Sequence, residues 1–359
     1  MPQRTTTKRV MLAALLLGSM TSTIRGSAAT NSSHSVTARP SASAGLVARV
    51  MRNSTAAASI RVGAIFLDAQ GFYGGVKAGF QNQAKKESVS LRLIETNTGD
   101  DVSKESSFIS TMVSTQVQAI ILSAASSKAS MPAIRSAYQA GIPVVCYNTC
   151  IDPADIKKYV YAYAYGDPVK FGAVTGALAA QYFLANHIRT PQIGIINCEF
   201  VEVCIQRHQG FWSTLKAKVP GAQIVANQQG TTSDQSVSVA GDVLSAHPHL
   251  SAFYGESGGA TIGAVKAVQA RGLTGKVVVF GSDMTTDIAK ALLDGPILKG
   301  EADVSGKILG ALTFDQVRTA VNGGGKSTGK IVTTPIDSYS ASDKSKVRHW
   351  VQTHADGLP

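Results

Sequence analysis

The sequence predicts an α/β fold made of two doubly wound parallel-sheet lobes. From Ile60 onward, short apolar runs alternate with amphipathic stretches of helical length, which is the pattern of parallel strands joined by crossover helices. The chain holds about ten such units, more than one open sheet usually accommodates. The tyrosine-rich stretch 159–167 divides the units into two similar series. Two sheets, each covered by helices on both faces, are therefore expected.

The elements follow one another in a regular order. In the first series we predict strands at 61–67, 90–95, 117–123 and 142–148, and helices at 71–87, 102–115 and 131–141. In the second we predict strands at 192–197, 222–227, 250–255, 276–281 and 297–303, and helices at 169–187, 203–218, 234–247, 259–272, 285–295 and 306–324. The stretch 159–167 is interpreted as a crossing between the series, and a final helix is expected near 342–350.

The first 29 residues have the three parts of a secretory signal peptide. A basic segment, MPQRTTTKR, precedes the apolar core VMLAALLLGSM, and small residues follow, with Ser27 and Ala29 placed for cleavage. Residues 30–59 are rich in Ser, Ala and Thr without a hydrophobic period, which predicts a disordered leader. We therefore expect export to the periplasm by a cleaved signal peptide, and folded material from about Ile60.

The charge distribution argues against a nucleic-acid partner. The formal charge is +11, but residues 1–59 hold seven Arg or Lys and no acid, so the rest carries +11 − 7 = +4. No cluster of basic residues interleaved with aromatics is present in the body of the chain. We expect no nucleic-acid binding.

Polar residues directly after the strands are the first candidates for a ligand site. In doubly wound sheets, ligands bind outside the carboxyl ends of the strands. This rule selects residues from both halves of the chain, which would line a cleft between two lobes: Asp68, Gln70, Ser123, Asn148, Glu199, Ser257, Asp283 and Asp303.

Several local patterns resemble one protein family. They are VGAIFLDAQGFYGGVKAGF, AGIPVVCYN, CIQRHQGF, AHPHLSAFYGESGGATIGAVKAV and VVVFGSDM, in that order. Together they resemble the periplasmic sugar-binding proteins of ABC importers, in the ribose/galactose-binding group, over nearly all of residues 60–340.

The resemblance implies a type I periplasmic-binding fold with a three-strand hinge. One lobe would comprise residues 60–164 plus 304–334 and the other residues 165–303 plus 335–359. It further implies a monomer without cofactor or metal, which captures a sugar or polyol and delivers it to an ABC transporter permease without catalysis.

The resemblance also assigns ligand-binding roles to individual residues. Phe72 and Tyr73 would form an aromatic platform that stacks on the C–H face of a sugar. Gln70 and Asn148 would be polar groups of the first lobe, and Arg207, Asp283 and Asp303 would bind hydroxyl groups from the second lobe or hinge. Asp68, Ser123 and Ser257 are ligand-binding candidates from their strand-end positions alone.

Three positions depart from the family pattern. Ribose and galactose binders usually have Asp-Arg where this chain has Asn148-Thr149, Asn-Asp where it has Ser257-Gly258, and, in ribose binders, Gln where it has Asp303. The ligand is therefore not expected to be ribose.

Four cysteines in an exported chain predict disulfides. Four cysteines allow three pairings, and we favour the local pairs Cys146–Cys150 and Cys198–Cys204, each closing a loop at a strand end. Two alternatives are disfavoured. A thiol enzyme using Cys204 and His208 leaves the first two cysteines without a role, and a four-thiolate zinc site would join both lobes and lock the hinge.

Other interpretations stay open from the sequence alone. Arg207 could form only a surface ion pair with Glu199 or Glu202. Asp283 could be a helix N-cap, and one of the two adjacent aromatics could belong to the core. For the whole chain, the alternatives are a ligand-sensing module that presents its closed form to a membrane receptor, or an exported thiol-dependent or hydrolytic enzyme.

Overall fold

The computed structural model describes residues 59–359 except 70, 100, 324 and 326. The predicted signal peptide at 1–29 and the predicted leader, up to residue 58, lie outside the described residues, as does Gln70. The first strand begins at Ile60, where folded material was expected.

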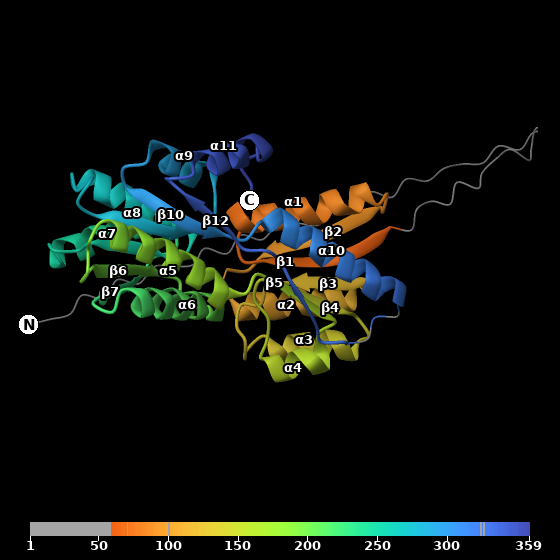
Figure 1. Ribbon diagram of the computed structural model, residues 1–359. Helices are drawn as coiled ribbons and strands as arrows, with labels where there is room; N and C mark the ends of the chain where they lie inside the picture. Colours follow the sequence, from red (N-terminus) through yellow and green to blue (C-terminus); the bar gives the residue numbers. More distant parts are fainter. Residues whose placement is uncertain (1–58, 70, 100, 324, 326) are drawn as a thin grey trace, which may run out of the picture. The chain divides into compact units, whose positions relative to one another are not determined.

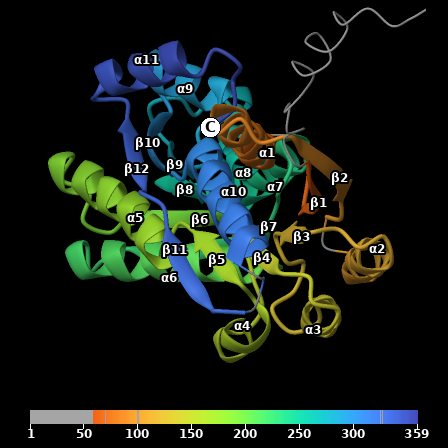
Figure 2. The same ribbon diagram turned by 90° about the vertical axis from the view of Figure 1, so that its right-hand side faces the viewer.

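The first sheet has six parallel strands in the order β11-β5-β4-β3-β1-β2. Its strands are β1 (Ile60–Phe66), β2 (Leu91–Asn97), β3 (Ala119–Leu122), β4 (Val144–Tyr147), β5 (Ala162–Tyr165) and β11 (Lys330–Thr333). Helices α1 (Gly71–Lys86) and α10 (Gly306–Gly323) cover one face of this sheet, and α2 (Val102–Ser114) and α3 (Met131–Gln139) cover the other (Figure 2).

The second sheet repeats this order as β12-β10-β9-β8-β6-β7, with only β12 antiparallel to its neighbour. Its strands are β6 (Gln192–Asn197), β7 (Gln223–Gln229), β8 (Ala252–Gly255), β9 (Val278–Ser282), β10 (Leu298–Asp303) and β12 (Asp337–Ser340). Its helices are α5 (Pro168–Ala185) and α6 (Glu202–Lys218) on one face, and α7 (Ser233–Ala246), α8 (Gly258–Ala270), α9 (Thr286–Asp294) and α11 (Lys344–Thr353) on the other (Figure 1).

The chain passes between the two sheets three times, after β5, after β10 and after β11. The predicted architecture of two doubly wound parallel lobes joined by a three-strand hinge is thus confirmed. The exact lobe boundaries, residues 60–164 plus 304–334 and residues 165–303 plus 335–359, stay a prediction.

The tyrosine-rich stretch is a strand rather than an irregular crossing. β5 alternates buried alanines, Ala162 and Ala164, with half-buried tyrosines, Tyr163 and Tyr165. This period of two is the signature of a strand. A short helix that the sequence analysis did not predict, α4 (Pro153–Tyr159), precedes it.

Close contact between α5 and α6 fixes the position of α6 on the second sheet. A Cβ atom added at Gly172 of α5 would lie 1.8 Å from the backbone oxygen of Arg207, and one added at Gly210 of α6 would lie 1.9 Å from the oxygen of Val169. Only glycine permits backbones to approach so closely. None of the helices in the described residues is both long and apolar enough to cross a membrane.

Candidate ligand-binding site

The strand order reverses between β1 and β3 in the first sheet and between β6 and β8 in the second. Crevices outside the carboxyl ends of such strands are the usual ligand sites of doubly wound sheets. Asp68 and Ser123 follow β1 and β3, and Glu199 and Glu256 follow β6 and β8. The topology therefore selects the same edges that the strand-end rule selected from the sequence.

Three predicted residues of the first sheet form one polar group. The Tyr73 hydroxyl lies 3.4 Å from the Ser123 hydroxyl and accepts a hydrogen bond of 3.1 Å from the Asn148 side-chain amide. Ser123 also lies 2.8 Å from the Thr149 hydroxyl, so a residue that departs from the family pattern takes part in the network. Burial raises the pKa of Tyr73, so this hydroxyl keeps its proton at neutral pH.

The two adjacent aromatics have different surroundings. The Tyr73 ring meets Phe72 edge to face at 5.2 Å, and both side chains are half-buried. Phe72 also packs against an apolar cluster near the hinge formed by Phe171, Ala302 and Val304. Phe72 therefore has an aromatic face beside the hinge, whereas the Tyr73 hydroxyl joins the polar group. Their stacking on a sugar stays a prediction.

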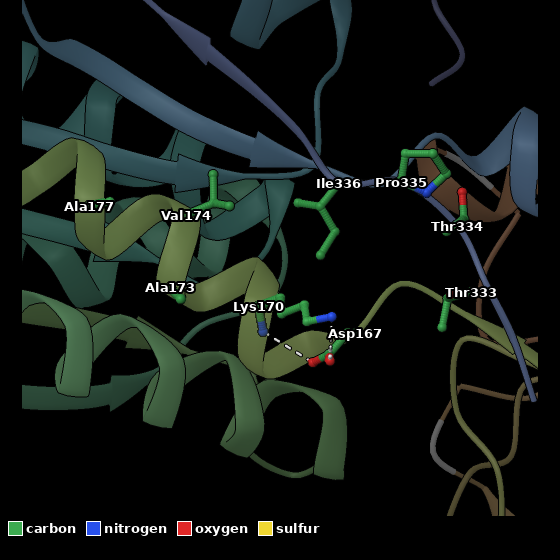
Figure 3. A pocket seen from close by; sticks show the side chains of 9 residues that line it. All are labelled: Asp167, Lys170, Ala173, Val174, Ala177, Thr333, Thr334, Pro335 and Ile336. Atoms are coloured by element: carbon green, nitrogen blue, oxygen red, sulfur yellow. Dashed lines mark hydrogen bonds and ion pairs between the residues drawn. The ribbon is translucent and has the colours of Figure 1, made fainter.

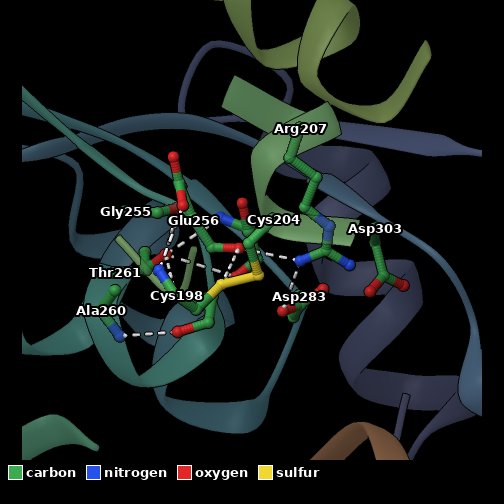
Figure 4. A network of polar contacts seen from close by, with 12 residues as sticks. Cys198, Cys204, Arg207, Gly255, Glu256, Ala260, Thr261, Asp283 and Asp303 are labelled. Atoms are coloured by element: carbon green, nitrogen blue, oxygen red, sulfur yellow. Dashed lines mark hydrogen bonds and ion pairs between the residues drawn. A yellow bond between two sulfur atoms is a disulfide. The ribbon is translucent and has the colours of Figure 1, made fainter. Parts of the chain in front are cut away.

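Arg207, on α6, and Asp283, directly after β9, form a largely buried ion pair beside the second sheet. Their side chains are 8% and 16% exposed, and Arg207 Nη1 donates to Asp283 Oδ2 at 3.1 Å. The same nitrogen donates to the Glu256 backbone oxygen at 2.8 Å (Figure 4). The guanidinium also lies 3.9 Å over the Phe171 ring. The interpretation of Arg207 as a surface ion pair with Glu199 or Glu202 is therefore wrong.

Each side chain of this ion pair has one polar atom that makes no hydrogen bond to the described residues. Among the described residues, Arg207 Nε and Asp283 Oδ1 are buried and lack a hydrogen-bond partner. Buried polar atoms normally find one, so each of the two atoms keeps an unused hydrogen-bonding position. Burial acts to lower the pKa of Arg207, but the Asp283 carboxylate outweighs it, so that pKa is raised and the cation persists.

Two predicted binders adopt left-handed backbone conformations directly after strands. Asn148 has φ 58° and Asp283 has φ 62°. Asn and Asp tolerate this conformation better than most residues. The N-cap of α9 is Thr285, whose hydroxyl accepts from Ile288 N. The interpretation of Asp283 as an N-cap is therefore wrong.

The other predicted residues mainly make contacts that support the fold. Asp303 is 2% exposed and accepts a hydrogen bond from Met284 N at 2.9 Å, and burial raises its pKa to about 7. Ser257 is the N-cap of α8 and accepts from Ala260 N. Asp68 is exposed, and its carboxylate helps to raise the pKa of Tyr73. Ligand contacts by these residues stay predictions.

The polar groups of the two sheets lie close to each other. The Arg207 guanidinium acts to lower the pKa of Tyr73, and Tyr73 acts to raise the pKa of Arg207. Phe72, from α1, shares an apolar cluster with Phe171, from α5. The predicted residues of the two sheets therefore converge on one region beside the hinge.

The cysteines form the two local disulfides that the sequence analysis favoured, Cys146–Cys150 and Cys198–Cys204. No cysteine of the described chain is free. Cys204 therefore has no thiol available to act as a nucleophile with His208, and neither a Cys-His enzyme nor a four-thiolate zinc site is compatible with this pairing.

Two important residues were not predicted as ligand-site residues. Glu256 is fully buried, accepts from Cys198 N at 3.1 Å and supplies the backbone oxygen that holds Arg207. The Phe171 ring lies beneath the Arg207 guanidinium. Glu256 directly follows β8, so the strand-end rule could have selected it in place of Ser257. Phe171 is one of many apolar residues on α5, and no sequence signal distinguishes it.

Two cavities lie near the passages between the sheets. One, of about 580 Å³, lies between α5 and the crossing segment 333–336, and its two charged residues, Asp167 and Lys170, already pair with each other (Figure 3). The other, of about 160 Å³, lies between the strand-end loops of the first sheet and the start of α6. Its lining is Ala124, Ala125, Ser126, Ser127, Thr149, Cys150, Phe200, Val201, Glu202 and Ile205. The smaller cavity lies at the edges that the topology selects, but of the residues in the two polar groups only Thr149 lines it.

Comparisons with known proteins place the chain in a family. The Periplasmic binding protein domain matches residues 64–325. The ABC transporter periplasmic-binding protein YphF of Escherichia coli is 51% identical over 298 residues, which cover 83% of this chain and 90% of that protein. A D-ribose/D-allose-binding protein of Pseudomonas aeruginosa is 29% identical over 237 residues, covering 64% of this chain and 72% of that protein.

A solved structure agrees in fold. The ABC transporter solute binding protein from Burkholderia multivorans, with an unknown ligand represented as alpha-D-erythrofuranose, superposes with a TM-score of 0.68 at 26% identity. The match covers 79% of this chain and 99% of that one. The chain belongs to the periplasmic binding protein family.

Proposed function

We propose that this protein captures a sugar or polyol between its two sheets and delivers it to the permease of an ABC transporter, with no chemical change to the ligand. Family membership and the name of the 51% identical relative support the transport role. The relative named as a D-ribose/D-allose-binding protein supports a monosaccharide or a similar polyol as the ligand class.

The observation that carries the ligand class is the Arg207–Asp283 pair. Its two unpartnered atoms are one donor, Arg207 Nε, and one acceptor, Asp283 Oδ1, both buried. Adjacent hydroxyl groups of a polyol offer an acceptor and a donor, and hydrogen bonds to ionised groups are the strong ones. The pair neutralises itself, so the site favours an uncharged guest over an anion or a cation.

The first sheet complements this pair with neutral groups. The hydroxyls of Tyr73 and Ser123 and the amide of Asn148 can each donate or accept. Phe72 adds an apolar surface suited to the C–H face of a sugar ring. A ligand held by both sheets would make its full set of contacts only when the hinge is closed, so binding shifts the hinge toward closure.

The rest of the proposal concerns the cell. We propose that the signal peptide at 1–29 is cleaved, that the mature chain works as a monomer in the periplasm, and that its closed form is what the permease recognises. The two disulfides in the described chain fit an oxidising compartment.

A binding screen tests the proposal. Thermal shifts against pentoses, hexoses, furanoses and linear polyols would identify the ligand, and titration calorimetry would give its affinity. Arg207→Ala should lower that affinity at least about 100-fold, since charge-assisted hydrogen bonds contribute about 1.5–3 kcal/mol each. Tyr73→Phe should lower it about 10-fold by removing one hydroxyl.

A matched control is Lys158→Met, which removes an exposed ion pair with Asp155 in α4 and should leave the affinity unchanged. Unchanged affinity in Arg207→Ala would show that the ligand binds elsewhere. Conversion of the ligand to a product by the purified protein would show that it is an enzyme.

A further inference from the structure

A second cluster of ligating side chains lies beside the proposed sugar site. Glu199 follows β6, His208 is on α6, and Glu256 follows β8. One ligand atom from each residue lies within 4.8 Å of those of the other two. His208 Nδ1 is 2.6 Å from Glu199 Oε1 and 3.5 Å from Glu256 Oε1. These distances bring side chains from three separate segments together at one point.

Glu256 gives an independent sign that this cluster holds a ligand. Its side chain is fully buried, and among the described residues its Oε1 atom has no hydrogen-bond donor. A buried carboxylate oxygen without a donor is costly. The other oxygen, Oε2, already accepts from Cys198 N, so the orphaned atom is the one that faces His208 and Glu199.

We propose that Glu199, His208 and Glu256 bind one divalent transition-metal ion, with Zn²⁺ as the preferred occupant. Imidazole nitrogen and carboxylate oxygen are both atom types that zinc accepts as ligands, and three such ligands leave a fourth position for water.

The present spacing is close to what such an ion needs. Two ligands of a tetrahedral zinc ion lie about 3.3 Å apart, and His208 Nδ1 and Glu256 Oε1 are already separated by 3.5 Å. The distance between His208 Nδ1 and Glu199 Oε1, now 2.6 Å, must lengthen by less than an ångström. The Glu199 side chain is 28% exposed and is otherwise held by Asn227, so it has room to move. The partial exposure of Glu199 and His208 leaves a position for water.

The metal would brace the site that holds the sugar. His208 is the neighbour of Arg207 on α6, and the Glu256 backbone oxygen accepts from Arg207 Nη1. Two of the three ligands are therefore tied directly to Arg207. An ion that joins β6, β8 and α6 would restrain the guanidinium in its binding position.

The test uses the full chain without a histidine tag, titrated with ZnCl₂ by calorimetry and by dialysis with metal analysis. We expect one Zn²⁺ per chain and a higher melting temperature with zinc, because an ion that binds only the folded state stabilises it. His208→Gln and Glu256→Gln should each weaken zinc binding at least about 10-fold. Glu199→Gln, at a half-exposed position, gives a variant with little risk to the fold.

The matched control is His247→Gln with His249→Gln, which removes the His-Pro-His pair from the loop before β8. This double variant should bind zinc as the wild type does. Cobalt titration adds a spectroscopic readout, since tetrahedral Co²⁺ absorbs visible light strongly and this band should be lost in His208→Gln. The absence of saturable zinc binding at millimolar concentration would overturn the proposal, and so would equal binding by Glu199→Gln, or loss of binding only in the His247/His249 variant. None of these outcomes depends on the sugar, so the proposed transport function is tested separately.

Discussion

The substitution Asp283→Asn isolates the charge of the buried ion pair. Asn has nearly the same size as Asp and, like Asp, tolerates the left-handed conformation that Asp283 adopts, with φ 62°. The substitution leaves Arg207, only 8% exposed, without its counter-ion. Breaking a buried pair in this way costs about 3–5 kcal/mol.

We expect the cost of Asp283→Asn to lie at the lower end of that range. Arg207 Nη1 keeps its hydrogen bond to the Glu256 backbone oxygen at 2.8 Å, and the guanidinium stays 3.9 Å over Phe171. We therefore expect Asp283→Asn to lower the free energy of unfolding by about 3 kcal/mol. Asp283→Ala should cost roughly 1 kcal/mol more, because Ala is disfavoured in the left-handed region.

The double variant Arg207→Met with Asp283→Asn completes the cycle. Removing both charges leaves no uncompensated ion, so its stability should recover to within about 1 kcal/mol of the wild type. The exposed pair Asp155–Lys158 provides a control, and Lys158→Met should change stability by no more than about 0.5 kcal/mol.

Urea denaturation followed by tryptophan fluorescence is a suitable assay. The chain has two tryptophans, Trp212 and Trp350, and they pack on opposite faces of the second sheet, so their emission reports on the lobe that holds the pair. The reasoning is refuted if Asp283→Asn costs less than about 1 kcal/mol, or if the double variant is no more stable than Asp283→Asn.

Three further predictions concern packing, pH and disulfides. Gly172→Ala should destabilise the protein by about 3 kcal/mol or more, since its Cβ would lie 1.8 Å from a backbone oxygen. Gly323→Ala, with no described atom within 4 Å of its added Cβ, should stabilise the protein by about 0.5–1 kcal/mol. Thermal denaturation measures both, and equal effects would contradict this reasoning. Burial raises the pKa of Asp303 to about 7, above its unfolded value of about 4, so the native state holds more protons between these values. The free energy of unfolding should therefore fall as pH rises through them, on the order of 4 kcal/mol in total. Asp303→Asn should flatten this slope in urea titrations from acid to neutral pH, and an unchanged slope would assign it to other groups. Replacing Cys198 and Cys204 by serine should cost about 2 kcal/mol on the chain-entropy estimate for a loop of this size, measured as a shift of the urea midpoint without a change of slope.

Much of the fold could be predicted because it depends on local patterns. Apolar runs separated by amphipathic stretches identify strands and crossover helices wherever they occur. The elements that were missed include α4 and β5. β5 has alternating Ala and Tyr in place of a continuous apolar run, and its strand character depends on pairing with β4 and β11. The local cysteine pairs were also predictable, since each closes a short loop at a strand end.

The candidate site was predictable only in part. Strand-end positions selected Asp283 and Asn148, and the family resemblance added Arg207 and Tyr73, but neither indicated which of these residues touch. The partnership of Arg207 with Asp283 joins residues 76 positions apart, on α6 and after β9. No sequence spacing encodes such a contact, and the alternatives for Arg207 and Asp283 were decided only by the partners found in the structure.

By itself, the sequence determined the alternation of strands and helices, the division into two series, the strand-end polar residues and the loops closed by disulfides. All of these depend on neighbours along the chain. Only the tertiary structure decided that Arg207 is buried against Phe171 and Asp283, that Glu256 belongs beside it, and that Glu199 and His208 meet Glu256. Those facts depend on burial and on charge pairing across separate elements, which exist only once the helices and strands have packed.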